Sequence, residues 1–339
     1  MKAAVYVEKS SPLVLKDLPK PEPAPGQLRI RVKACGVCGS DIHASEADWT
    51  PTGIVMGHEF AGVVDAVGEG VTRWRPGDRV APLAQISCGG CDACRAGDEQ
   101  PCENPELIDY NPERGGAYAE YTIVGARDAL PLPDALSFEE AAAVEPLAVG
   151  LDAVRRARLT EDDSVLIIGG GPIGLSITQW ARFFGARDVV VSELNPARLK
   201  IAEAMRATGT IDASSAPDTI EAFVELTGRK PTVIIEAVGV PSMIQRCIEM
   251  AKPESRIVVV GVCQATDTFE PMQCILKSLT LIFAYGYSTD DYAYIIELLG
   301  SGQLTAKPLI SHRVSLDELP AAFEALRRPG DQIKVIVEP

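Results

Sequence analysis

The rhythm of hydrophobic and polar positions changes partway along the chain. In the first 150 residues, short runs rich in apolar residues are separated by turns rich in proline and glycine. This pattern is typical of a β-rich fold, because short strands need frequent turns. The strands that it predicts are Ala3–Val7, Leu28–Ala34, Gly62–Val67 and Arg79–Ala81.

After about Leu151 the chain alternates between apolar runs and amphipathic stretches. Unbroken apolar strands that alternate with helices indicate a parallel sheet covered by helices on both faces. The expected strands are Val165–Ile168, Val189–Ser192, Val233–Ile235, Ile257–Val262 and Leu279–Ala284. The expected helices are Leu175–Phe184, Pro196–Ala207, Ile220–Leu226 and Met243–Met250. The last 50 residues predict two further helices and a final strand, at Asp291–Leu299, Leu316–Arg327 and Ile333–Val337.

Composition narrows the class of protein. A chain of 339 residues, 46% of them hydrophobic, is long enough for two domains, each with its own core. The formal net charge of −15 repels phosphate backbones and anionic membranes, so we expect no nucleic-acid or membrane partner. The longest mainly apolar run, Val165–Ile177, is too short and too rich in glycine to span a bilayer. The first ten residues lack an apolar export signal, so we expect a cytoplasmic protein.

A glycine-rich turn follows the first apolar run of the second half. Residues 169–174 read Gly-Gly-Gly-Pro-Ile-Gly and match G-x-G-x-x-G between a predicted strand and a predicted helix. The first glycine of the motif permits a tight turn, the second lets the backbone approach a pyrophosphate, and the third lets the helix pack on the strand. The candidate cofactor-binding residues of this turn are Gly169, Gly171, Pro172, Ile173 and Gly174.

An acidic residue stands where such a turn needs one. Glu193 lies 19 residues beyond Gly174, at the end of the next apolar run, where a carboxylate accepts hydrogen bonds from the adenine ribose. The same carboxylate repels a 2′-phosphate, so we predict a preference for NAD over NADP. Arg198, five residues further on, would reach that phosphate only if Glu193 turned away.

Nine cysteines are present, and four of them cluster in one loop. Cys88, Cys91, Cys94 and Cys102 follow the spacing C-x2-C-x2-C-x7-C. Four thiolates at this spacing can close a tetrahedral zinc site with no open position, so the predicted role of this zinc is structural. An iron–sulfur cluster is the alternative, but nothing else in the sequence indicates electron transfer.

A second group of metal-ligating residues is spread over three short motifs. They are Cys-Gly-Ser-Asp-Ile-His at 38–43, Gly-His-Glu at 57–59 and Glu-Pro at 145–146. One cysteine, one histidine and one carboxylate can hold zinc and leave a fourth position for water or substrate, as in catalytic sites. Taken alone, His58 is better explained as a core histidine, and Cys38 can be a small buried hydrophobic residue. Together with the glycine-rich turn, these motifs predict a catalytic zinc.

The order of these motifs resembles the zinc-dependent medium-chain alcohol dehydrogenases along essentially the whole chain. Within this family the chain is most similar to the polyol, butanediol and threonine dehydrogenase branch, which usually carries the Glu-Pro motif found here at 145–146. The resemblance implies a GroES-like β-rich catalytic domain over residues 1–150 and a Rossmann domain with a doubly wound parallel sheet over 151–287. Residues 288–339 would return to the catalytic domain. It also implies an active site between the domains and a homotetramer or homodimer.

The same resemblance assigns zinc ligands. Cys38 and His58 would bind the catalytic zinc, and Glu59, Glu145 or water would complete its coordination. Asp41 would orient His58 through the other ring nitrogen.

It also implies the route of the proton and the hydride. Ser40 would contact the substrate oxygen and His43 would end a proton relay. The implied reaction is the reversible oxidation of a secondary alcohol to a ketone, with zinc as a Lewis acid and the hydride passing to NAD. Two rival interpretations are a reductase of the same superfamily without catalytic zinc, and a non-enzymatic protein that binds zinc and a nucleotide.

One departure from the polyol dehydrogenases bears on the substrate. Those enzymes carry Phe-Arg-Tyr at the end of the last Rossmann strand, whereas this chain reads Phe283-Ala284-Tyr285. Without the arginine we expect substrates with few hydroxyls, such as aliphatic or cyclic secondary alcohols, diols and hydroxyketones. Sorbitol-type polyols and L-threonine are the alternatives. Trp49 and Tyr118 would either line the pocket or pack within the barrel.

Overall fold

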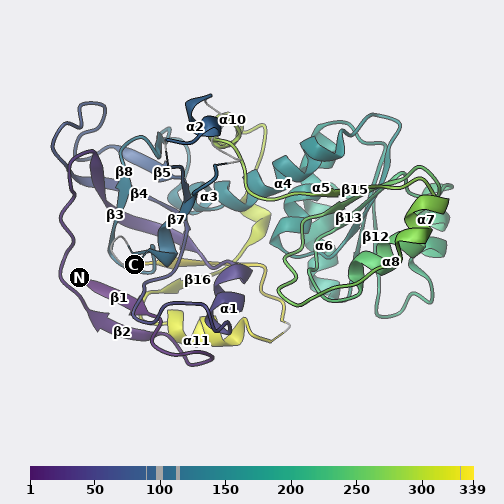
Figure 1. The fold of residues 1–339 in the computed structure, drawn as a ribbon, viewed down its shortest axis with the longest axis horizontal. Helices are drawn as coiled ribbons and strands as arrows, with labels where there is room; N and C mark the ends of the chain where they lie inside the picture. Colours follow the sequence, from purple (N-terminus) through teal and green to yellow (C-terminus); the bar gives the residue numbers. More distant parts are fainter. Residues whose placement is uncertain (89, 97–101, 112–114, 329) are drawn as a thin grey trace. The chain divides into compact units, whose positions relative to one another are not determined.

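The computed structural model describes all residues except 89, 97–101, 112–114 and 329 (Figure 1). The chain forms two compact units. Unit 1 contains Met1–Glu145 together with Ser288–Pro339, and unit 2 contains Pro146–Tyr287. Unit 1 is therefore built from two separate stretches of sequence.

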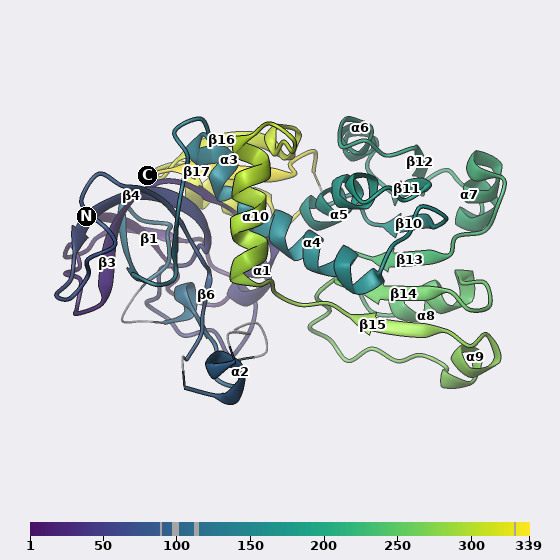
Figure 2. The same ribbon diagram turned by 90° about the horizontal axis from the view of Figure 1, so that it is seen from above.

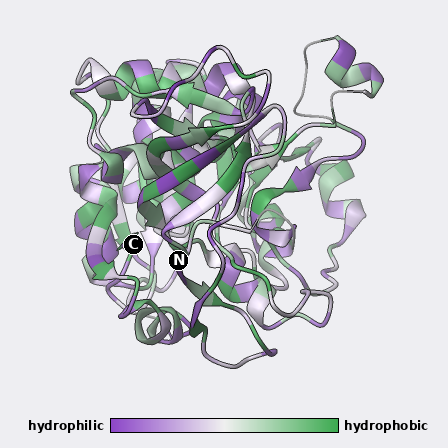
Figure 3. Ribbon diagram, turned by 90° about the vertical axis from the view of Figure 1, so that its left-hand side faces the viewer, coloured by the Kyte–Doolittle hydropathy of each residue, from purple (hydrophilic) through white to green (hydrophobic). Residues whose placement is uncertain are grey.

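Unit 1 is organised around strand β3 (Gln27–Gly36), the longest of its strands. β3 pairs antiparallel with β4 (Glu59–Val67), β8 (Tyr121–Gly125) and β17 (Lys334–Glu338). Buried and exposed residues alternate along most of β3, as expected for a strand with one face on the core. Figure 3 shows this alternation of hydrophobic and hydrophilic residues on the strands of unit 1. The predicted β-rich domain is therefore confirmed.

The remaining elements of unit 1 complete the sheet and cover it. The seven-stranded sheet also contains β5 (Arg79–Pro82), β9 (Ala129–Pro131) and β16 (Ile310–Ser315). Two small sheets pair β1 (Lys2–Val5) with β2 (Val14–Asp17), and β6 (Gln85–Ile86) with β7 (Glu106–Leu107). The helices are α1 (Gly39–Ser45), α2 (Asp92–Arg95), α3 (Phe138–Ala142), α10 (Thr289–Gly300) and α11 (Leu319–Ala325), with 3-10 turns at Ile108–Tyr110 and Lys307–Leu309.

Unit 2 holds a six-stranded parallel sheet in the order β12-β11-β10-β13-β14-β15. Its strands are β10 (Ser164–Ile168), β11 (Asp188–Glu193), β12 (Gly209–Asp212), β13 (Val233–Glu236), β14 (Arg256–Val259) and β15 (Thr280–Phe283). β10, β11 and β13 are largely buried along their length, which explains their unbroken apolar sequence. The predicted doubly wound parallel sheet is confirmed.

Helices cover both faces of this sheet. α5 (Pro172–Phe183) and α6 (Pro196–Ala204) lie on one side of the strands, and α7 (Thr219–Thr227) and α8 (Met243–Met250) lie on the other (Figures 1 and 2). α9 (Pro271–Leu276) precedes the edge strand β15, and α4 (Val144–Ala157) leads into the unit. The order of strands reverses beside β10, so the glycine-rich turn that follows β10 lies at the switch point where such folds bind ligands.

Several boundaries differ from the sequence-based expectation. The strand expected at Ile257–Val262 ends at Val259, because the chain turns at Gly261. A Cβ atom there would lie 2.3 Å from the backbone nitrogen of Gly239, so only glycine permits this close approach. The short edge strand β12 was not predicted, and α11 begins three residues later than expected. No helix in the described part of the chain is long and apolar enough to cross a membrane.

Candidate metal and cofactor sites

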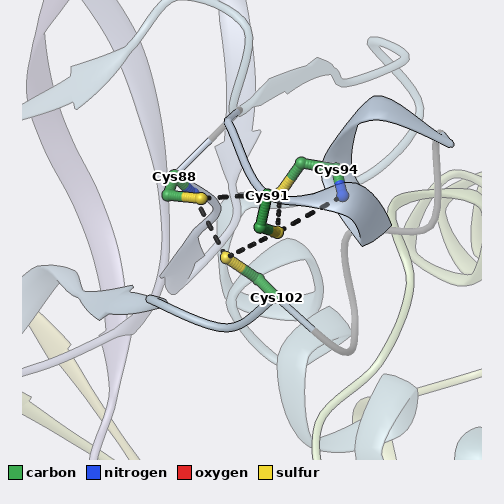
Figure 4. A group of neighbouring side chains, drawn as sticks. All are labelled: Cys88, Cys91, Cys94 and Cys102. Atoms are coloured by element: carbon green, nitrogen blue, oxygen red, sulfur yellow. Dashed lines mark hydrogen bonds between the residues drawn. The ribbon is translucent and has the colours of Figure 1, made fainter.

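The four cysteines of the loop converge on one point (Figure 4). The Sγ atoms of Cys91 and Cys94 lie 3.4 Å apart, and the Cys88–Cys94 and Cys91–Cys102 pairs are each separated by 4.0 Å. A tetrahedral zinc ion with bonds of about 2.3 Å separates its sulfurs by about 3.8 Å. The sulfur positions therefore fit one zinc ion held by four protein ligands.

The local backbone favours the thiolate form that metals bind. Cys91 caps the N-terminus of α2, and its sulfur accepts a hydrogen bond from the Cys94 N–H at 3.5 Å. This bond and others from the loop lower the pKa of Cys91 to about 6. A backbone hydrogen bond from Gly90 likewise lowers the pKa of Cys88.

The second group gathers three ligand types at one end of the β3–β4 pair. Donor atoms of Cys38, His58 and Glu59 all lie within 4.8 Å of one another. Cys38 stands at the N-cap of α1, shortly after β3. Glu59 is the first residue of β4, and His58 directly precedes it. Because Gly36 pairs with Glu59 in the sheet, motifs some 20 residues apart meet here. We call these three residues the Cys-His-Glu group.

Glu59 is held by a buried ion pair. Lys334 on β17 donates to Glu59 Oε1 at 2.6 Å and to the carbonyl of Val37 at 3.0 Å, and both charged side chains are 1% exposed. Oε2 of Glu59 is buried and accepts no hydrogen bond from the described residues. A buried carboxylate oxygen without a partner is costly. The donor set and this oxygen therefore fit a bound cation.

His58 is fixed from the other side by carboxylates. Its Nδ1 lies 2.6 Å from Asp109 Oδ2 and 3.5 Å from Asp41 Oδ1. Burial alone would lower the pKa of His58, but these two carboxylates raise it. Asp41, to which the family resemblance assigned this contact, is thus the more distant partner. Asp109 was missed because it lies outside every motif.

Glu145 lies in the first turn of α4 and is buried, but it is not part of the Cys-His-Glu group. Burial raises the pKa of Glu145 to about 7, with His58 opposing the rise and Glu59 adding to it. A carboxyl group with this pKa changes its charge near neutral pH.

The two residues of the expected relay lie on α1. Ser40 and His43 are three positions apart and so share one face of the helix, with Ser40 partly buried and His43 exposed. No hydrogen bond joins Ser40 to His43 in the described part of the chain.

Two aromatic residues divide between surface and core. Trp49 is 61% exposed, and its ring meets Tyr110 edge to face at 5.4 Å. Tyr118 is fully buried, and its hydroxyl donates to Asp41. Tyr118 therefore packs within the core of unit 1, whereas Trp49 is exposed and rests on the partly buried Tyr110.

The glycine-rich turn has the space that its motif requires. Gly169 has φ +102°, and a Cβ on Gly174 would lie 1.9 Å from the Gly169 carbonyl oxygen. Gly171 caps α5, and a Cβ there would meet nothing within 4 Å. Among the described residues, no side chain accepts a hydrogen bond from the first amides of this helix, which opens with Pro172 and Ile173. Open space beside uncapped amides fits a pyrophosphate.

Glu193 is oriented by the backbone around it. Oε2 accepts the Gly170 N–H at 2.7 Å, and Oε1 accepts those of Leu194 and Asn195 at 2.8 and 2.9 Å. The guanidinium of Arg198 lies 3.9 Å from Oε2. The carboxylate is therefore fixed at the end of β11, beside the glycine-rich turn.

Comparison with known proteins identifies the family. Residues 24–134 match the alcohol dehydrogenase GroES-like domain, and residues 172–301 match the zinc-binding dehydrogenase family. An L-threonine 3-dehydrogenase from Alteromonas mediterranea is 32% identical, covering 100% of this chain and 99% of its own. A sorbitol dehydrogenase from Gallus gallus is 32% identical, with 99% and 96% covered.

Solved structures agree over the full length. The 2R,3R-butanediol dehydrogenase from Bacillus subtilis has a TM-score of 0.88 and 31% identity, covering 100% of this chain and 99% of its own. Two further structures each have a TM-score of 0.90 and 31% identity, again covering 100% of this chain and 99% of their own. They are rspB of Escherichia coli complexed with NADH and a zinc-binding dehydrogenase of Sinorhizobium meliloti bound to NADP. The chain therefore belongs to the zinc-containing medium-chain alcohol dehydrogenases, in the threonine, sorbitol and butanediol dehydrogenase branch, and is an NAD-dependent zinc dehydrogenase acting on CH–OH groups.

Proposed function

We propose that this enzyme reversibly oxidises a secondary alcohol with few hydroxyls, such as a diol, a hydroxyketone or an aliphatic or cyclic alcohol. The observation that carries the proposal is the Cys-His-Glu group, in which one buried oxygen of Glu59 lacks a partner. Zinc bound there would supply Lewis-acid stabilisation of negative charge on the substrate oxygen. The four-cysteine cluster has no open position, so its zinc would be structural.

The residues of the chain have distinct tasks in this proposal. Cys38, His58 and Glu59 hold the metal, and Glu145 is the alternative ligand. Lys334 neutralises one oxygen of Glu59 and thereby limits the negative charge of the group. Ser40 takes up the proton of the alcohol as its own hydroxyl proton leaves, and His43, whose exposure on α1 gives contact with water, ends the relay.

Two features support a substrate with few hydroxyls. Ala284, which follows β15, stands where the polyol dehydrogenases carry an arginine, so that hydrogen-bond donor is absent. Tyr110 follows Asp109, which contacts His58, and packs against the exposed ring of Trp49, so aromatic side chains lie near the Cys-His-Glu group. Apolar lining with few polar groups favours substrates that need little hydrogen bonding.

The test compares kcat/KM for cyclohexanol, 2,3-butanediol, sorbitol and L-threonine with NAD. We expect cyclohexanol or butanediol to exceed sorbitol by about tenfold, or about 1.4 kcal/mol in transition-state binding. An advantage of sorbitol or L-threonine of that size would overturn the substrate proposal. The Ala284→Arg variant provides a matched control, because it should raise the relative kcat/KM for sorbitol.

We infer that NAD is preferred over NADP by a wide margin. Three backbone amides fix the Glu193 carboxylate, so it cannot turn aside easily for a 2′-phosphate, and two negative groups in contact repel each other. We expect kcat/KM for NAD to exceed that for NADP at least tenfold, and Glu193→Ser to narrow the ratio. A wild-type ratio at or below one would refute the inference and give Arg198 the dominant role.

We propose further that the enzyme is a homodimer or homotetramer. β15 is an edge strand of the unit 2 sheet, and Phe283 at its end is 62% exposed. On α9, Met272, Ile275 and Leu276 are 62%, 70% and 76% exposed. Exposed apolar side chains beside an open sheet edge are typical of an interface, and a second copy supplies a matching surface.

A further inference from the structure

Asp109 lies in a short 3-10 turn between two anchored residues. Ile108 before it is fully buried in the core of unit 1, and its N–H donates to the carbonyl of Ala84 at 3.1 Å. Tyr110 after it packs its ring against Trp49. Residues locked on both sides hold the carboxylate in one position, which is the property that a metal site needs from its supporting residues.

The Asp109 carboxylate contacts His58 directly. Oδ2 lies 2.6 Å from Nδ1, whereas Oδ1 is buried and accepts no hydrogen bond from the described residues. Asp109 is 0% exposed. A fully buried carboxylate is tolerated only when its interaction with a partner offsets the free-energy cost of desolvation.

Asp41 is less suited to the same task. Its nearest approach to His58 Nδ1 is 3.5 Å, at the outer limit of a hydrogen bond. It also accepts the hydroxyl of Tyr118 and, at 3.4 Å, the N–H of Cys38, which caps α1. Asp41 thus contributes mainly to the fold around α1.

The three side chains of Asp41, His58 and Asp109 also lie close enough to suggest a metal site of their own. The 2.6 Å between His58 Nδ1 and Asp109 Oδ2 excludes this, because two ligands of one tetrahedral zinc ion lie about 3.3 Å apart. Since Nδ1 faces Asp109, Nε2 is the nitrogen left for an ion in the Cys-His-Glu group.

We propose that Asp109 is a positioning residue for that ion: it fixes the ring of His58 so that Nε2 is presented to the metal. The proposal rests on the proposed function, which places zinc in the Cys-His-Glu group. Loss of a carboxylate that orients a metal-bound histidine typically weakens metal affinity 10- to 100-fold. The ring would keep its place in the fold but lose its fixed orientation.

The experiment measures metal binding by the full chain. Wild type, Asp109→Ala, Asp109→Asn and Asp41→Asn are titrated with zinc against a chelator, and the cobalt-substituted proteins are compared by visible absorption. We expect Asp109→Ala to weaken zinc binding at one site by roughly 10- to 100-fold. Asp109→Asn keeps an acceptor oxygen in a side chain of the same size. Its zinc affinity should therefore fall less than that of Asp109→Ala but more than that of Asp41→Asn.

The cobalt bands of the four-cysteine site serve as the internal control and should not change. Unaltered zinc affinity and unaltered cobalt bands in both Asp109 variants would overturn the proposal, as would a larger loss in Asp41→Asn than in Asp109→Asn. If Asp109→Ala fails to fold, the isosteric Asp109→Asn decides by the same criteria. A wild-type protein that binds zinc only at the four cysteines would instead refute the proposed function, because Cys38→Ser would then leave zinc binding unchanged.

Discussion

At the scale of single residues, Asp163 shows how unit 2 secures the start of its central strand. Its carboxylate accepts hydrogen bonds from Thr232 Oγ1 at 2.6 Å, from the N–H of Thr160 at 2.8 Å and from the guanidinium of Arg256. Burial alone would raise the pKa of Asp163, but the bonds from Arg256 and Thr232 hold it below its usual value. The ionised carboxylate therefore joins the segments of Thr160, Thr232 and Arg256 at the start of β10.

Asp163→Asn should lower the free energy of unfolding by about 3 kcal/mol at pH 7, since a buried charged partner is lost. The folded pKa lies below the unfolded one, so the stabilisation is complete above about pH 4 and disappears as pH falls through the folded value. The difference between wild type and variant in urea unfolding should therefore shrink in acid. Asp162→Asn, at the exposed neighbouring position, is the control and should be nearly neutral. A pH-independent difference would contradict this account.

Residue-scale spacing also decides what the sequence could reveal. The cysteines of the loop, the glycine-rich turn and Glu193 occupy local motifs, so their roles follow from short stretches of sequence. Asp109 and Lys334 do not, because they meet His58 and Glu59 across 51 and 275 positions. Such contacts depend on the folded sheet. The one signal for Asp109 is a single acid between the apolar Ile108 and Tyr110.

At the scale of elements, two glycines of the glycine-rich turn meet different requirements. Gly174 must be small because α5 packs against the Gly169 carbonyl, whereas Gly171 faces open space and has a φ of −73° that other residues adopt. One glycine therefore serves the fold, and the other leaves room for the cofactor.

Gly174→Ala should destabilise the protein by about 2 kcal/mol, because the added methyl forces α5 away from the strand. Gly171→Ala should melt like wild type but raise KM for NAD about tenfold, since the methyl occupies space that a pyrophosphate needs. Thermal unfolding and steady-state kinetics distinguish the two effects. Equal melting temperatures for both variants would argue against this division.

The cysteine loop is an element held together by its ligands. Cys94→Ser should remove about one zinc per chain and lower the melting temperature, because the loop has little core of its own. Cys38→Ser should remove the other zinc and abolish turnover while the fold is kept. Metal analysis and calorimetry of the two variants provide the measurement. An active Cys38→Ser protein, or a wild type with a single zinc, would contradict the assignment.

At the scale of the whole molecule, the hydrophobic periodicity predicted the β-rich sheet of unit 1 and the parallel sheet of unit 2, but not every strand in them. Apolar runs identified β10, β11 and β13 because these strands are buried on both faces. The edge strand β12 escaped detection because it is short and contains a glycine. The exposed strand β2 has no apolar alternation to reveal it.

The exposed apolar side chains of α9 and β15 provide a test of the proposed association between copies. The double variant Ile275→Glu/Leu276→Glu should reduce the mass in solution to that of a smaller species, down to the 36.2 kDa chain, because burying two charges in an interface is costly. Val14→Glu, an exposed apolar position in unit 1, is the matched control and should leave the mass unchanged. Light scattering coupled to gel filtration gives the answer. An unchanged mass for the double variant would exclude this surface as the interface.

The division of unit 1 into two stretches of sequence has a consequence for biosynthesis. Unit 2 is continuous, so all its strands have left the ribosome once residue 287 is free, and domains generally fold as units during synthesis. Unit 1 lacks β17 until much later, and with it the lysine that neutralises Glu59. The sheet of unit 1 therefore stays incomplete on the nascent chain while unit 2 is already able to fold. A premature stop before Lys334 would leave the Glu59 carboxylate buried without its counter-ion, and quality-control proteases rather than weak catalysis would determine the fate of such a chain.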